Sequence, residues 1–170
     1  MIRIALATLA LTAAPALADS PAENWSLEVG KDPVSWENVA TLTTESSIEI
    51  ANEYATKQVR PLLIFQCRPG GDGSVSVRVD WQRFISSFNT EVGFKADEKD
   101  LLLVNWGVDK SNRITQPRGA SDSRELLAYL KGAIRLQVEV IPYSASLLSV
   151  NFDVSGIDTA LATLIAKCSG

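Results

Sequence analysis

The apolar run Pro61-Leu-Leu-Ile-Phe-Gln-Cys67 leads through a turn, Arg68-Pro-Gly-Gly-Asp-Gly73, into Ser74-Val-Ser-Val-Arg-Val-Asp-Trp81. In the last piece valines and a tryptophan alternate with polar residues, the period of two expected of a strand with one buried face. The middle piece is rich in Gly, Pro and Asp, which favour turns. The two outer pieces are therefore predicted to be neighbouring strands of a β-hairpin.

The same alternation recurs on both sides of this hairpin. It predicts a second hairpin from Ile134–Val140 and Leu148–Val154, and a third from Val92–Ala96 and Leu101–Trp106 around a charged turn. Three further strand candidates lie nearer the N-terminus: Trp25–Val29, Val39–Thr43 and Ile48–Tyr54.

Helices are expected to be few. Asp122-Ser-Arg-Glu125 has the spacing of a capping box before an apolar run, and Gly132 is placed to end that helix. A final helix is predicted to begin at Ser155-Gly-Ile-Asp158 with Ser155 as its cap, and Gln82–Ser87 to form a short helical turn. The predicted fold class is α+β: a mostly antiparallel, sandwich-like sheet with two α-helices.

The N-terminus has the features of a secretory signal peptide. Arg3 supplies a positive start, Ile4–Ala14 is apolar, and the small residues Ala16 and Ala18 form a cleavage site. The apolar run is too short to cross a bilayer of roughly 30 Å. We therefore expect a signal peptide at 1–18, cleaved after Ala18, and a single domain at 19–170 that is periplasmic or secreted and has no membrane span.

In such an oxidising compartment, the two cysteines of the chain are expected to form a disulfide. Cys67 ends a predicted strand, and Cys168 lies on the apolar stripe of the final helix, which comprises Ile157, Ala160, Leu161, Leu164 and Ile165. A redox-active pair would need a short CxxC-type spacing, which is absent. A structural disulfide that ties the C-terminal helix to the sheet is therefore predicted.

The composition excludes several kinds of function. The 170 residues include no histidine, so Ser-His-Asp catalysis and histidine-ligated zinc are ruled out. A net charge of -4 argues against nucleic acid as a partner, because a phosphate backbone needs a basic face. No motif for a cofactor or a metal is apparent, so none is expected.

Two sets of residues could still form a site. The acids Asp80, Asp97, Glu98, Asp100 and Asp109 could hold calcium, but they lack the DxDxDG spacing and are interpreted as solvated turn residues. Five aromatic residues could line a glycan or peptide groove: Trp25, Trp36, Trp81, Trp106 and Tyr143. Aromatic residues on alternating strands lie more often in the core.

A contact surface is the remaining candidate. Trp36 lies in an irregular stretch after Asp32, where a tryptophan has less reason to be buried, and Arg113 to Arg118 form a basic extended segment in an acidic protein. Asp32, Trp36, Arg113 and Arg118 are therefore the predicted contact residues.

The order of the motifs resembles the VasI/TagO family of type VI secretion-associated proteins, from about Trp25 or Asp32 to Cys168. The motifs that carry this resemblance are Pro61–Arg68, Asp80-Trp81, Phe94–Asp97, Trp106–Asp109, the Leu126–Leu130 helix, Val138–Tyr143 and Asn151–Asp158. Lys95 stands where an arginine is usual, and Asp109 where a serine often follows the tryptophan.

The resemblance implies an extracytoplasmic accessory protein with a signal peptide and a cysteine pair, and it supplies no catalytic residue. Two functions are therefore compatible with the sequence. The preferred one is a non-enzymatic module that docks on a protein of the cell envelope by an exposed face or sheet edge, in secretion or envelope assembly. The alternative is an envelope hydrolase or glycan-acting enzyme that uses paired carboxylates.

Overall fold

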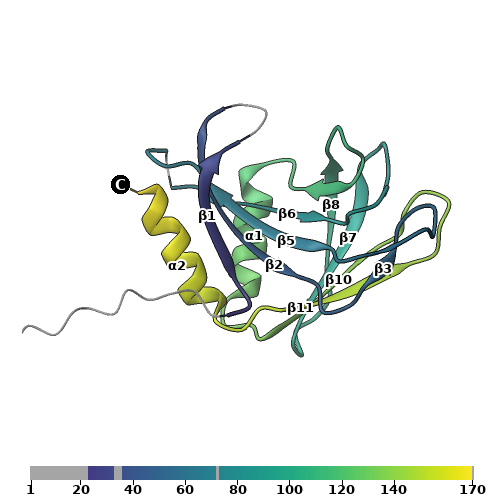
Figure 1. The fold of residues 1–170 in the computed structure, drawn as a ribbon. Coiled ribbons are helices and arrows are strands. Elements are labelled where there is room, and N and C mark those ends of the chain that lie inside the picture. Colours follow the sequence, from purple (N-terminus) through teal and green to yellow (C-terminus); the bar gives the residue numbers. More distant parts are fainter. Residues whose placement is uncertain (1–22, 33–35, 72, 170) are drawn as a thin grey trace, which may run out of the picture.

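The computed structural model describes residues 23–32, 36–71 and 73–169, which form 11 strands and two helices (Figure 1). The predicted signal peptide at 1–18 lies outside the described residues. The strands are β1 (Ser26–Lys31), β2 (Asn38–Glu45), β3 (Ile50–Ala51), β4 (Gln58–Val59), β5 (Leu62–Cys67), β6 (Ser76–Asp80), β7 (Thr90–Ala96), β8 (Leu102–Val108), β9 (Ile114–Gln116), β10 (Arg135–Val140) and β11 (Leu148–Asp153). The helices are α1 (Ala120–Leu130) and α2 (Ile157–Cys168).

Nine of these strands form one antiparallel sheet in the order β1-β2-β5-β6-β9-β8-β7-β10-β11. The three predicted hairpins are confirmed: β5 pairs with β6, β7 with β8 and β10 with β11. In β5 and β6 every second residue is buried, as the alternation requires, and Phe65 lies opposite Val77. The period of two in the sequence thus sets both the strands and the face that each turns to the core.

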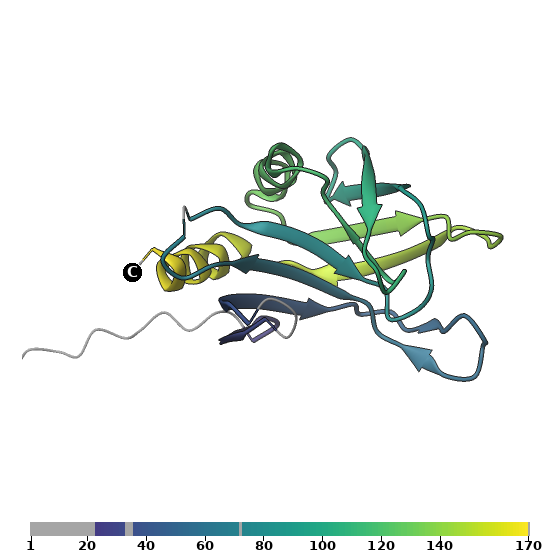
Figure 2. The same cartoon turned by 90° about the horizontal axis from the view of Figure 1, so that it is seen from above.

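The sheet curls, so that the far end of β2 meets β11 (Figure 2). Ser46, just after β2, forms an antiparallel bridge with Phe152 of β11, and the Ser47 N–H donates to the Asn151 carbonyl at 2.8 Å. Before β1, the Trp25 indole Nε1 donates to the Ser155 carbonyl at 2.9 Å. We call this junction of β2, β11 and the start of β1 the seam.

The core lies inside the curl and includes the ring of Trp106 against that of Phe94, with centroids 4.9 Å apart. Helix α2 covers β2 and β5 with its buried residues Ile157, Ala160 and Leu164. Cys168, at its last position, is bonded to Cys67 of β5, with the two Cα atoms 6.1 Å apart. The predicted disulfide and the α+β fold class are both confirmed.

Both predicted helix caps are wrong. Helix α1 begins at Ala120 after Gly119, so Asp122 already lies in its first turn and makes no capping bond. Before α2 the cap position is Gly156, with φ of 74°, and the Ser155 N–H and hydroxyl both donate to the Asp153 carboxylate. Gly132, with φ of 70°, follows α1 as expected.

The predicted helical turn at Gln82–Ser87 is also wrong, because its backbone groups bond elsewhere. The Gln82 N–H donates to the Asp80 carboxylate at 2.8 Å, and the Ile85 N–H donates to the Asn112 carbonyl. Of the strand candidate Ile48–Tyr54, only β3 forms.

Asp97 fastens the β7–β8 turn to the start of β10. Its carboxylate accepts the Arg135 N–H at 2.9 Å and the Ile134 N–H at 3.1 Å. These hydrogen bonds lower the pKa of Asp97, and the one from the Arg135 N–H has the largest effect. Because the folded pKa lies below the unfolded one, the stabilisation is present above the unfolded pKa and is lost as the pH falls through the folded pKa.

We therefore predict that Asp97→Asn lowers the free energy of unfolding by about 1 kcal/mol at pH 7, since one charged acceptor is lost. Urea titrations at several pH values should show the difference from wild type closing below about pH 4. Asp100→Asn in the same turn is the control and should change little. A deficit for Asp97→Asn that stayed constant down to pH 2 would contradict this role.

Candidate functional site

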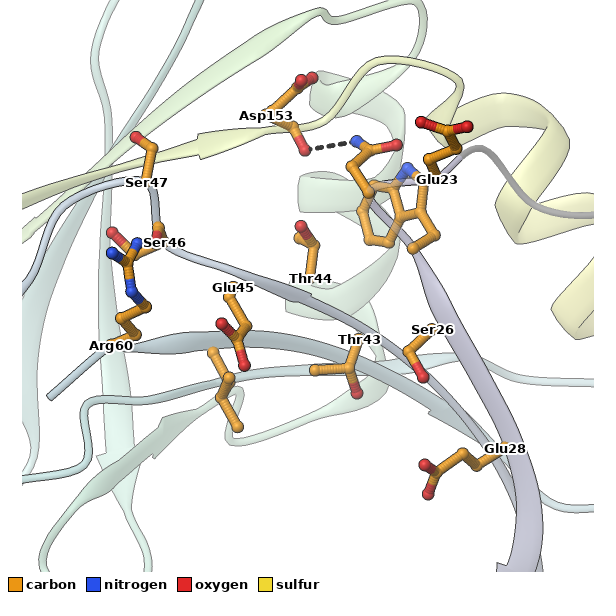
Figure 3. Close-up of a pocket in the computed structure, with 13 residues that line it drawn as sticks. Glu23, Ser26, Glu28, Thr43, Thr44, Glu45, Ser46, Ser47, Arg60 and Asp153 are labelled. Carbon is orange, nitrogen blue, oxygen red and sulfur yellow. Dashed lines mark hydrogen bonds between the residues drawn. The ribbon is translucent and has the colours of Figure 1, made fainter.

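The candidate site is a pair of cavities on either side of the seam. The first, of about 630 Å³, is open to solvent, and its residues are drawn in Figure 3. They come from the start of β1 and the residues before it, from the end of β2, from the start of β5 and from the end of β11: Glu23, Asn24, Trp25, Ser26, Glu28, Thr43, Thr44, Glu45, Ser46, Ser47, Arg60, Leu62 and Asp153.

The pairing of β2 explains why a cavity forms here. Ser26 is the first residue of β1 and pairs with Thr43, so Thr44 and Glu45 extend beyond the reach of β1. The bridge to β11 begins only at Ser46. Between these two partners the sheet leaves a gap, and Figure 3 shows Thr43, Thr44 and Glu45 along it.

One wall of the gap is held in place by hydrogen bonds across the seam. The Asn24 side-chain amide donates to the Asp153 carbonyl at 2.8 Å, a bond marked in Figure 3. Trp25 is buried, packs against Phe65 and donates to Ser155. The wall is therefore anchored to the last residue of β11 and to the connection between β11 and α2.

The first cavity is acidic. Four carboxylates line it, those of Glu23, Glu28, Glu45 and Asp153, against one guanidinium, that of Arg60. Arg60 is engaged, because it forms an ion pair with Glu49 at 3.2 Å and donates to the Ser46 carbonyl at 3.1 Å. Hydrogen bonds from the Ser155 hydroxyl and N–H lower the pKa of Asp153. The cavity thus favours a cationic occupant.

The second cavity, of about 670 Å³, shares Ser47 and Asp153 with the first. Its floor is a polar row across three strands, because Gln137 of β10 lies opposite both Lys95 of β7 and Asn151 of β11. Arg135, Asp97 and Glu98 also line it, so both signs of charge are present. The two cavities adjoin at Ser47 and Asp153, one acidic and the other of mixed charge, and we call the pair the groove.

Two of the acids singled out in the sequence do come together elsewhere. Burial raises the pKa of Asp80, and the charge of Asp109 raises it further. Burial also raises the pKa of Asp109, but hydrogen bonds from Ser111, Ile114 and Arg113 outweigh it and hold that pKa below its ordinary value. Neither acid lines the two cavities.

Because the pKa of Asp80 is raised whereas that of Asp97 is lowered, replacing Asp80 should have the opposite effect on stability at neutral pH. A carboxyl whose folded pKa is raised contributes stability that is present below its unfolded pKa and is lost as pH rises through the folded value. At pH 7, Asp80→Asn should therefore have a free energy of unfolding at least equal to that of wild type. Urea titration at pH 7 and pH 3.5 checks this. A variant destabilised at both pH values would contradict it.

The predicted contact residues do not form one patch. Asp32 and Trp36 lie in the β1–β2 connection, where Trp36 has 73% of its surface exposed. Arg113 and Arg118 flank β9, four places along the sheet from β1, roughly 19 Å at about 4.8 Å per strand. Arg113 forms an ion pair with Glu53 at 3.2 Å, and Arg118 is exposed. Contact of any of the four with a partner stays a prediction.

The aromatic residues on the predicted strands are buried as expected, but Tyr143 is exposed. Trp25, Trp81 and Trp106 are buried, whereas Tyr143, in the β10–β11 loop, has 69% of its surface exposed. The acids of the groove were missed, because Glu28 and Glu45 look in the sequence like ordinary solvated positions. Glu28 and Glu45 lie on the consecutive strands β1 and β2, but Asp153 reaches the same cavity only because the end of β2 bridges to the distant strand β11.

In the part of the chain that the structure describes, no group of three acidic or cysteine side chains is placed to hold a metal ion. Neither helix in it has the length and apolar character needed to cross a membrane.

No protein-family model matches the chain, and no curated protein matches it. Among solved structures it is similar to invasion associated protein B from Bartonella henselae, with a TM-score of 0.52 and 15% sequence identity. The match covers 84% of this chain and 92% of that one. At this identity the likeness concerns the fold alone, and the VasI/TagO resemblance stays a prediction.

Proposed function

We propose that this chain is a non-enzymatic accessory protein that works outside the cytoplasm, in the periplasm or after secretion, by binding a protein of the cell envelope. One observation carries the proposal: a disulfide-tied sheet leaves a charged groove beside its edge strand. Structural disulfides persist in oxidising compartments, which supports export. Exposed grooves at sheet edges are common places for a partner chain to dock.

The VasI/TagO resemblance supports the same class of function. It suggests a role in type VI secretion or in envelope assembly, and it suggests no catalytic residue. The function of the chain would then be defined by the protein that it binds and not by a reaction product.

Photo-crosslinking in the cells that make the protein tests this proposal. A photoreactive residue replaces Glu45 in the groove and, in separate variants, Glu125 of α1 and Asn105 of β8, all three of which are exposed. We expect a discrete crosslinked envelope protein from at least one position. Absence of any crosslinked protein from all three positions, with the chain present and its disulfide formed, would overturn the proposal.

A second function is favoured by the interaction of Asp80 with Asp109. Two carboxyls whose environments push their pKa values apart are the arrangement that acid–base catalysis on glycans uses. If the chain is instead an envelope hydrolase, the purified protein releases fragments from isolated cell-wall glycan, and Asp80→Asn and Asp109→Asn each abolish the release. Release of fragments would replace the binding proposal, and no release by wild type would remove the hydrolase.

A further inference from the structure

We propose that β1 is the docking edge, and that its partner is an extended protein segment of alternating apolar and basic residues, which adds to the sheet as a further strand. This inference rests on the proposed binding function and names the chemistry of the partner. Three features of β1 carry it: its open edge, its incompletely covered apolar face and its acidic face.

The open edge comes from the place of β1 in the sheet. Within the described residues β1 pairs with β2 alone, so its other side presents backbone groups that no strand of these residues meets. All residues of β1 except Leu27 are exposed. Such an edge binds an extended segment by main-chain hydrogen bonds, and the side chains of the segment then give specificity.

The apolar face of β1 is covered at one end only. Trp25, Leu27 and Val29 lie on the core side, and their exposure rises along the strand from 5% for Trp25 to 59% for Val29. An added strand would place its own side chains beside Leu27 and Val29. Apolar residues at those positions would remove the exposed surface of Val29 from water, which favours binding.

The opposite face of β1 belongs to the acidic cavity. Ser26 and Glu28 line that cavity together with Glu45 of β2, and Arg60 is already engaged by Glu49. Side chains of an added strand on this face would lie along the same surface, so Lys or Arg complements it. Because neighbouring residues of a strand point to opposite faces, the two requirements together specify the alternation of apolar and basic residues.

A second copy of this chain fits the edge less well. Pairing β1 with β1 would set two acidic cavities side by side in a chain of net charge -4, which repulsion disfavours. We therefore assign this edge to a basic segment and not to a second copy, and self-association would appear as a dimer in the experiment below.

The test is a titration of the exported protein, purified with its disulfide intact, against fluorescent ten-residue peptides. One peptide alternates Val and Lys, a second has the same composition with the valines and lysines in two blocks, and a third alternates Val and Glu. We expect the alternating Val–Lys peptide to bind at least tenfold more tightly than either of the others.

Two further peptides test strand addition itself. Each is the Val–Lys peptide with N-methyl groups on alternate residues, at odd positions in one and at even positions in the other. A bound strand uses only one of its edges, so one methylated peptide should lose at least tenfold in affinity and the other should keep most of it. Equal loss for both would overturn strand addition.

Variants of the protein locate the site. The double variant Glu28→Lys/Glu45→Lys should weaken binding of the Val–Lys peptide at least tenfold, and Val29→Ser should weaken it less. Asp122→Lys/Glu125→Lys on α1 is the control, because it changes the net charge by the same amount and α1 and β1 lie on opposite sides of the molecule (Figure 2). Equal weakening by this control would mean that net charge alone attracts the peptide.

The outcomes separate this inference from the proposed function. A partner crosslinked from Glu125 or Asn105, with no binding of the Val–Lys peptide, would leave the function standing and overturn the docking edge. A concentration-dependent dimer in sedimentation that Glu28→Lys/Glu45→Lys abolishes or changes would identify a second copy at β1 and would also overturn the basic segment as its occupant.

Discussion

Removal of the Cys67–Cys168 disulfide is expected to lower the free energy of unfolding by about 4 to 5 kcal/mol. The bond spans 101 residues, so the unfolded chain loses much conformational freedom when it is present. The bond also joins the last position of α2 to β5, and α2 covers part of the core. A loss of this size is comparable with the whole stability of many domains.

Urea unfolding of Cys67→Ala/Cys168→Ala, followed by tryptophan fluorescence, measures the effect. Both side chains are buried, so alanine avoids placing an unpaired polar group in the core. The matched control is reduction: a thiol reductant should destabilise wild type to a similar extent and leave the double variant unchanged. A wild type whose unfolding midpoint did not move on full reduction would contradict the role assigned to the bond.

The disulfide also links stability to the compartment in which the chain folds. Cytosolic reductants keep thiols reduced, so a chain retained there should be in the destabilised form. A variant without residues 1–18, made in the cytoplasm, should therefore accumulate less of the folded protein than the full chain with residues 1–18. Equal folded yields from both would remove an argument for export.

The sequence predicts the three hairpins because each depends on neighbouring segments. The alternation in Ser76–Asp80 fixes which face is buried, and the turn before it returns the chain alongside β5. The short strand β9 gave no such signal. It has three residues, and it joins the two halves of the sheet by pairing with both β6 and β8, which the local pattern does not encode.

The candidate site was predicted less well for a related physical reason. Glu28 and Glu45 lie on consecutive strands, but Asp153 is far from both in the chain, and the gap that the three residues line exists only because β2 changes partner from β1 to β11. The helix caps failed because glycine occupies both cap positions, which leaves Ser155 free to bond to Asp153. Cys67 and Cys168 were predictable because the helical stripe placed the second sulfur on the buried side.

Trp25→Ala is expected to lower the free energy of unfolding by about 3 to 5 kcal/mol, the usual cost of truncating a large buried aromatic side chain. Trp25 is 5% exposed, its ring lies 5.9 Å from that of Phe65, and its Nε1 donates to the Ser155 carbonyl at 2.9 Å. It therefore fixes the start of β1 to both the core and the β11–α2 connection. Urea unfolding at pH 7 measures the change.

Two variants divide this effect into its parts. Trp25→Phe keeps most of the apolar contact and removes the indole N–H, so it should cost less than Trp25→Ala, with about 1 kcal/mol of its loss from the hydrogen bond. Trp36→Ala, which removes a side chain that is 73% exposed, should stay within about 0.5 kcal/mol of wild type. If Trp36→Ala cost as much as Trp25→Ala, the seam would not be the place where β1 is anchored. If Trp25→Phe cost as much as Trp25→Ala, the hydrogen bond to Ser155 rather than the contact with Phe65 would hold the wall of the groove.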